Sequence, residues 1–157
     1  MKKTGKIVAV VLAALLVVAA LVVLAACGTD YNGDCHYSNT YGTYGVKVVV
    51  TVNGDTITAV RLLSDEESGY TRTTKSWKPE GEEGGVGLGF AGAEAAYDNW
   101  ISENIVGKTV SEVLAWEVTA TAESQTVGAG VPKLVGATQS SARIIAAIQN
   151  ALQGFAA

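Results

Sequence analysis

The longest apolar run in the chain extends from Ile7 to Ala26 and has no polar face. Three lysines precede it, at positions 2, 3 and 6. A basic start, an apolar stretch and a small-residue end are the layout of an export signal. We therefore expect residues 1–26 to direct the chain out of the cytoplasm. An uncleaved membrane-spanning helix is the alternative, because the run is long enough to cross a bilayer.

Alternating apolar and polar positions predict a β-hairpin at the start of the globular part. Residues 46–52 are mainly valine and are typical of a strand, and Thr56–Leu63 alternates as the returning strand. Asn53-Gly54-Asp55 between them suits a tight turn, since Asn and Gly tolerate positive φ. The polar, aperiodic segment before the hairpin predicts a flexible tether over residues 27–40.

Helical periodicity dominates the second half of the chain. We expect a helix over residues 91–103 and a shorter one over residues 110–116, opened by the capping-box pattern Thr109-Val110-Ser111-Glu112. A short strand is expected over residues 118–121. Together with the hairpin, these elements predict an α+β fold in a single domain over residues 41–157.

The last expected helix spans Ser140–Gln153, with Gly154 at its end. Its apolar positions follow 3.6-residue spacing and are Ile144, Ile145, Ile148 and Leu152. Such a stripe is typical of a helix that packs against a core with one face.

Net charge excludes one class of partner. Removing residues 1–26 takes away three of the 11 basic residues and none of the 15 acidic ones, so the formal charge changes from −4 to −7. A nucleic-acid-binding domain needs a basic face, so we expect no nucleic-acid partner.

The end of the apolar run, Leu24-Ala25-Ala26-Cys27, resembles the bacterial lipobox. The resemblance implies cleavage after Ala26 and lipidation of Cys27, which anchors the chain to the extracytoplasmic face of the cell membrane. Cys35 then has no partner within the chain. Cys35-His36 is a weak metal pair, because no further ligands lie near it in the sequence.

The start of the last expected helix carries the candidate binding chemistry. Gly136 and Ala137 allow a ligand to approach the backbone closely, and Thr138 presents a hydroxyl beside them. Free N–H groups at a helix start attract phosphate. Ser and Thr are also favoured helix caps, so an ordinary cap without a ligand is the alternative.

Residues 134–145 resemble the end of the FMN-binding domain family, which includes flavin-carrying subunits of sodium-pumping NADH:quinone oxidoreductase and of Rnf-type complexes. Its signature is Ser/Thr-Gly-Ala-Thr, with an Asp upstream and Thr/Ser-Ser downstream. The resemblance implies that FMN is esterified through its phosphate to Thr138 by a flavin transferase. The other matching positions are Gly136, Ala137, Ser140 and Ser141.

Earlier parts of the chain are similar to the same family. Residues 41–48 look like its glycine- and tyrosine-containing opening, and residues 64–69 resemble its Glu-Thr-x-Gly segment, which implies flavin contacts for Glu67 and Ser68. Two positions depart from the signature: Val135 replaces the first Ser/Thr, and Pro132 or Lys133 replaces the Asp. FMN held without a covalent bond therefore stays an alternative.

The resemblance implies an extracytoplasmic electron-transfer lipoprotein that carries FMN, an electron carrier or redox subunit rather than a stand-alone enzyme. Its expected partners are the membrane through the lipid, a flavin transferase, and a membrane dehydrogenase or extracytoplasmic reductase. A flavin-free surface lipoprotein that binds a ligand or a protein is the alternative function.

Two further patterns have weaker readings. Residues 87–92 match G-x-G-x-x-G, but no buried strand precedes them, so a dinucleotide-binding fold is not expected. Trp77, Trp100 and Trp116 offer rings for stacking on a flavin, although tryptophan serves more often as a core anchor.

Overall fold

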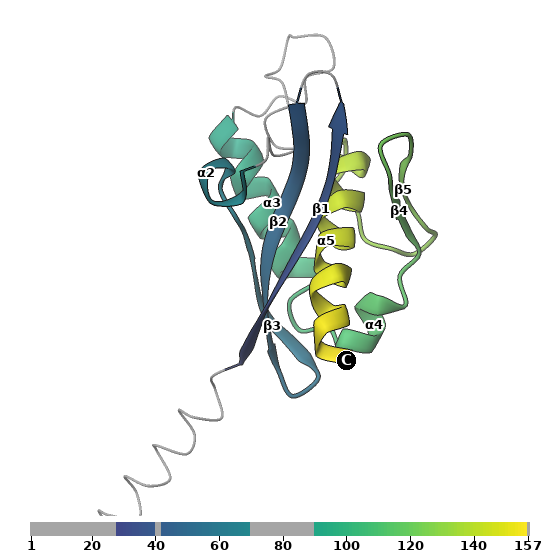
Figure 1. Ribbon diagram of the computed structural model, residues 1–157. Helices are drawn as coiled ribbons and strands as arrows, with labels where there is room; N and C mark the ends of the chain where they lie inside the picture. Colours follow the sequence, from purple (N-terminus) through teal and green to yellow (C-terminus); the bar gives the residue numbers. More distant parts are fainter. Residues whose placement is uncertain (1–27, 40–41, 70–89, 157) are drawn as a thin grey trace, which may run out of the picture.

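The computed structural model describes residues 28–39, 42–69 and 90–156 (Figure 1). The predicted signal segment, Cys27, Trp77 and residues 87–89 of the G-x-G-x-x-G pattern lie outside the described residues. The elements in chain order are β1 (Thr29–Asn39), β2 (Gly42–Asn53), β3 (Thr56–Leu62), α2 (Asp65–Ser68), α3 (Phe90–Asn104), α4 (Val110–Leu114), β4 (Val118–Ala120), β5 (Gln125–Val127) and α5 (Thr138–Ala156).

Strand β1 overturns the prediction of a flexible tether over residues 27–40. It pairs antiparallel with β2 along its whole length, from Thr29 opposite Val52 to Asn39 opposite Gly42. The residues of β1 that face the core are not branched aliphatics, which hid the alternation in the sequence. They are Tyr31, Gly33, Cys35 and Tyr37, and the residues between them are the polar ones.

The β2–β3 hairpin confirms the sequence prediction. The strands pair antiparallel in a sheet of order β1-β2-β3, with a bulge between Thr51 and Val52. Gly54 occupies the turn with a φ of 62°, which only glycine adopts without cost. One face of β2 is buried and the other is half-exposed, as a sheet with a single covered face requires. The buried residues are Val46, Val48, Val50 and Val52.

Helix α5 covers the buried face of the sheet and runs antiparallel to β1 (Figure 1). Its apolar stripe is confirmed, because Ile144, Ile145, Ile148 and Leu152 are all fully buried. The prediction that Gly154 ends the helix is wrong, since α5 continues to Ala156. Phe155 is held in the last turn by an edge-to-face contact with Tyr31, the ring centroids lying 5.8 Å apart.

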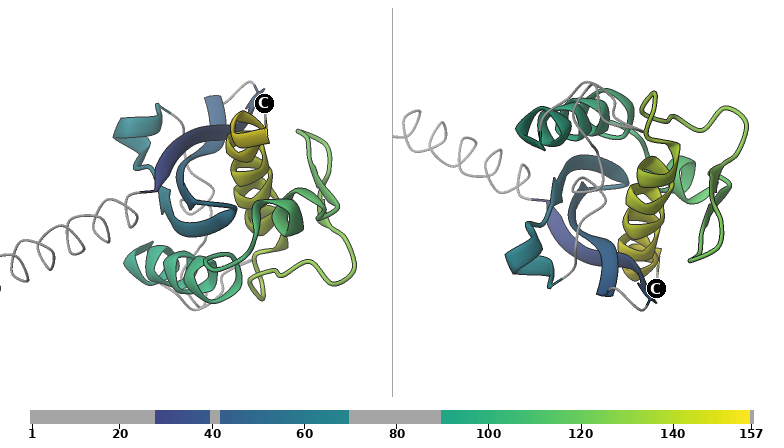
Figure 2. Two further views of the ribbon diagram at one scale, coloured as in Figure 1. Left: turned by 90° about the horizontal axis from the view of Figure 1, so that it is seen from below. Right: turned by 90° about the horizontal axis from the view of Figure 1, so that it is seen from above.

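Smaller elements surround this core. Helix α3 matches the predicted helix and packs beside β3 (Figure 2). Helix α4 has the predicted capping box: Thr109 Oγ1 accepts from Glu112 N at 3.2 Å, and Glu112 accepts from Thr109 N at 2.9 Å. Strand β4 is confirmed, whereas its partner β5 was not predicted. The fold is therefore the predicted α+β single domain.

The helices of the described residues are all too short or too polar to cross a membrane. The apolar run of residues 7–26 lies outside the part of the chain that this statement covers.

Candidate functional site

The start of α5 is built by a tight turn that one serine holds in place. Ala137 N donates to Leu134 O at 3.0 Å, and Gly136 takes the third position of this turn with a φ of 80°. Ser141 is fully buried in the first turns of α5. Its hydroxyl donates to Ala137 O at 2.9 Å and accepts from Leu134 N at 3.0 Å. Both ends of the turn are thus fixed to the helix.

The first turn of α5 lacks a side-chain cap. Ala137 occupies the N-cap position, because its carbonyl accepts the first helical bond, from Ser141 N at 2.9 Å, and alanine has no side-chain acceptor. The N–H groups of Thr138, Gln139 and Ser140 make no hydrogen bond to another described residue. Three unpaired donors at the positive end of a 19-residue helix form a good environment for a phosphate group.

The side chains around this helix start have distinct roles. Gly136 is exposed, Val135 is 91% exposed, and Thr138 is half-buried, so the backbone of the turn is open to a ligand. Ser140 is hydrogen-bonded to Tyr97 of α3. Burial raises the pKa of the Tyr97 phenol, and the bond to Ser140 opposes that rise. This bond ties the first turn of α5 to α3.

Replacing Ser141 with alanine is expected to loosen this turn. Leu134 N would lose its acceptor, and an unpaired buried N–H costs about 1–2 kcal/mol. We expect a fall of that size in the free energy of unfolding, measured by urea denaturation, together with lower flavin content. Gln139→Ala is the control, because Gln139 is exposed. Equal stability and flavin content in the two variants would contradict the assigned role.

The predicted flavin contacts Glu67 and Ser68 lie elsewhere in the fold. Glu67 caps α2, accepting from Ser64 N at 2.8 Å, and pairs with Arg61 at 2.9 Å. The hydrogen bond from Ser64 N is the main cause, and the bond from Arg61 the next, of a Glu67 carboxyl pKa lowered to about 2 in this exposed side chain. Ser68 is buried, and its N–H donates to Ser64 O at 2.9 Å.

The structure does not bring Glu67 together with Thr138. Arg61, the partner of Glu67, stands opposite Val49 and shares with it the sheet face that α5 does not cover. Figure 2 shows α2 across the sheet from α5. In contrast, the Gly136-Ala137-Thr138 motif, Ser140 and Ser141 form one continuous site at the start of α5.

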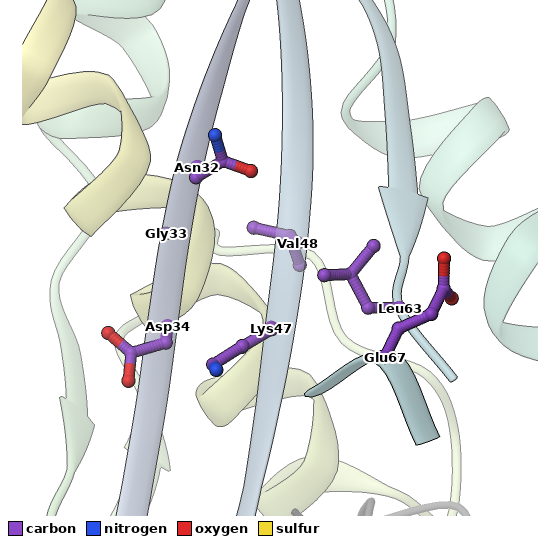
Figure 3. A pocket seen from close by; sticks show the side chains of 7 residues that line it. All are labelled: Asn32, Gly33, Asp34, Lys47, Val48, Leu63 and Glu67. Atoms are coloured by element: carbon purple, nitrogen blue, oxygen red, sulfur yellow. The ribbon is translucent and has the colours of Figure 1, made fainter. Parts of the chain in front are cut away.

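A pocket of about 330 Å³ lies on the face of the sheet near Glu67 (Figure 3). Its rim carries both charge signs, with Lys47 between Asp34 and Glu67. The full lining is Asn32, Gly33, Asp34, Lys47, Val48, Leu63 and Glu67. The sequence does not predict the β1 residues of this pocket, because their polar, aperiodic segment is typical of a tether.

A buried arginine in α5 was also missed. Arg143 is 8% exposed, and its guanidinium carbon lies 4.2 Å from the centre of the Tyr37 ring. Burial raises the pKa of the neighbouring Cys35 thiol, and the charge of Arg143 opposes this rise. The only signal in the sequence was a charged residue beside the apolar stripe. Among the described residues, no three His, Cys, Asp or Glu side chains gather as metal ligands.

Two of the three tryptophans lie in described parts of the chain. Trp100 is 5% exposed in α3, and its Nε1 has no hydrogen-bond partner among the described residues. Trp116 is half-buried after α4, where Gln149 of α5 donates to its carbonyl at 2.9 Å. Both serve the core or its edge.

Comparison with known families identifies the family of the chain that contains this helix start. Residues 42–153 match the FMN-binding domain family, which covers the β2–β3 hairpin, α3, α4 and most of α5. The chain belongs to the FMN-binding domain family. Searches among curated proteins and solved structures return no significant match. Membership supports a flavin-binding role with FMN as the cofactor.

The site at the start of α5 fits the phosphate of FMN on structural grounds alone. Its donors are backbone N–H groups that have no partner among the described residues, its N-cap is an alanine, and Gly136 is exposed beside them. The groups that would hold the phosphate are therefore the N–H groups of Thr138, Gln139 and Ser140, beside the exposed Gly136. The side chains of Ser140 and Ser141 position the turn.

Proposed function

We propose that this FMN-binding domain is an extracytoplasmic electron-transfer lipoprotein, anchored through Cys27 and carrying FMN esterified to Thr138. The observation that carries the proposal is the uncapped start of α5, in which the Thr138 hydroxyl stands beside three unpaired N–H groups. The family match supports the cofactor. The basic start and lipobox-like end of residues 1–27 support export and lipidation.

The cofactor supplies the redox chemistry, since a flavin accepts and donates electrons one or two at a time. The chain holds and orients it. Unpaired N–H groups of α5 bind the phosphate, and Thr138 Oγ1 provides the attachment atom. Ser141 fixes the turn that precedes Thr138 through its bonds to Leu134 and Ala137.

The charge of the mature chain bears on its partners. A formal charge of −7 for residues 27–157 favours association with a basic protein surface and disfavours an acidic one. We propose a membrane dehydrogenase or an extracytoplasmic reductase as the partner, and an exported flavin transferase as the enzyme that attaches FMN.

The test is to produce the full chain in a bacterium that has an exported flavin transferase. We expect the denatured protein to fluoresce in a gel and to carry the mass increment of FMN. We also expect it to incorporate labelled fatty acid, and Cys27→Ala to abolish that label. A colourless protein that also fails to bind added FMN would refute the flavin proposal. Unchanged acyl labelling in Cys27→Ala would refute the anchor.

A further inference from the structure

Almost no chain separates Cys27 from the folded domain. Gly28 follows it directly, and β1 begins at Thr29. Gly28 is packed tightly on β2, because a Cβ at this position would lie 2.6 Å from Thr51 Cγ2 and 2.8 Å from Val52 O. Consecutive Cα atoms are about 3.8 Å apart, so a lipid on Cys27 would be attached one residue from Gly28 at this end of the sheet. We call it the anchor end, defined by Gly28, Val52 and Gly54.

The start of α5 lies at the opposite end of the domain (Figure 1). Along the pair of β1 and α5, residue numbers in β1 rise while those of their contacts in α5 fall. The first joins Tyr31 to Phe155, and the last joins Tyr37 to Arg143. Between them, Asn150 Nδ2 donates to Asp34 O at 2.7 Å. This order places Thr138, five residues before Arg143, near the Tyr37 end of β1 and away from Gly28.

The separation follows from the geometry of the two elements. Between the Tyr31 and Tyr37 contacts, α5 rises about 18 Å and β1 advances about 20 Å, so the two measures agree. Adding the residues from Gly28 to Tyr31 and from Arg143 to Thr138, and allowing for strand twist, places Thr138 about 30 Å from the anchor end.

We infer that Thr138 is held about 30 Å above the lipid-anchored end, so that the redox partner is an extramembrane protein domain rather than a quinone dissolved in the bilayer. The inference rests on the proposed lipidation and flavin attachment. An FMN attached at Thr138 through its phosphate is shorter than the distance from Thr138 to the anchor end. Because β1 is a paired strand and not a flexible tether, the domain cannot bring the FMN down to the bilayer.

The surface next to Thr138 suits contact with a protein. Val135 is the one exposed large hydrophobic side chain among the described residues, at 91% exposure, and it lies in the turn that leads to Thr138. The motif from Leu134 to Ala142 carries no charge. When reduced FMN is oxidised there, two electrons pass to the partner, one to each of two haem groups for example, and two protons pass to water.

The height is tested by energy transfer from single dye-labelled cysteines to acceptor-labelled lipid headgroups. The full lipidated chain in liposomes carries Cys35→Ser and either Asp55→Cys, beside the anchor end, or Lys133→Cys, beside the start of α5. Both positions are exposed. We expect strong transfer from position 55 and loss of most transfer from position 133. Equal transfer from both would overturn the inference.

The partner class is tested on the same liposomes with photoreduced flavin. We expect oxidation by soluble cytochrome c and no oxidation by long-chain ubiquinone in the bilayer. A flexible insert of about 15 residues after Cys27, which spans roughly 20 Å, is expected to restore oxidation by ubiquinone. Oxidation of the unmodified protein by bilayer ubiquinone at the same rate as by cytochrome c would overturn the inference.

Acyl label and gel fluorescence are measured first on each preparation. Absence of either one refutes the proposed function and with it this inference. Presence of both, with equal transfer from positions 55 and 133, refutes the inference alone.

Discussion

Thr138→Ala is expected to abolish covalent flavin completely while leaving the domain folded. The substitution removes the hydroxyl of the residue that follows Gly136 and Ala137, so no ester with the FMN phosphate can form at position 138. Alanine is the best helix former and Thr138 is only half-buried at the start of α5, so the helix itself is retained. Flavin fluorescence of the denatured protein in a gel, and its intact mass, measure the loss.

Thr138→Ser is the matched control, because it keeps the hydroxyl and removes only a methyl group. We expect it to retain covalent FMN. The Ala variant is also expected to bind added FMN reversibly, since the N–H groups of residues 138–140 belong to the backbone and remain in place. Full-strength gel fluorescence from Thr138→Ala would show that the ester lies on another residue.

Gly33→Ala is expected to destabilise the domain by about 3 kcal/mol, a large part of the stability of a domain of this size. Gly33 lies where β1 approaches α5 most closely. A Cβ at this position would clash with Ala147 O. It would also lie 2.5 Å from Ala151 N and 2.7 Å from Ala151 Cβ. Two of these three are backbone atoms within the helix, which cannot move aside as a flexible side chain would. Urea denaturation of residues 28–157 measures the change.

Asn32→Ala is the control for Gly33→Ala. Asn32 is the neighbouring residue on the exposed face of β1, so its replacement is expected to change stability by less than about 0.5 kcal/mol. Similar, small effects of the two substitutions would mean that β1 does not pack on α5, and the argument for a fixed height of Thr138 would fail with it.

Most elements could be predicted from local patterns. Adjacent residues alone indicate the valine run of β2, the turn at Gly54 and the capping box at Thr109. The apolar stripe of α5, from Ile144 to Leu152, is also a local pattern, since it repeats over about two and a half turns. Strand β1 could not be predicted from its sequence, because its core-facing positions are tyrosine, glycine and cysteine. Gly33 is required by the approach of α5, which is a contact between segments more than a hundred residues apart.

The candidate site was predicted in part. The motif of residues 136–138 could be found from the sequence, since its residues are consecutive and resemble a family signature. The role of Ser141 could not, because its hydroxyl bonds Leu134 N seven residues earlier and becomes visible only when the turn is closed. Glu67 and Ser68 resemble part of the same site in the sequence, but they belong to the short helix α2, which lies across the sheet from α5.

The sequence by itself determined the α+β class, the hairpin, the long last helix and the candidate Gly136-Ala137-Thr138 motif at its start, because each depends on residues within a few turns of one another. Only the tertiary structure decided that residues 29–39 form a strand and that Glu67 is separated from Thr138. It also decided that Gly28 and Thr138 stand at opposite ends of the domain. These facts depend on which segments pack together, and packing joins residues that no local pattern connects.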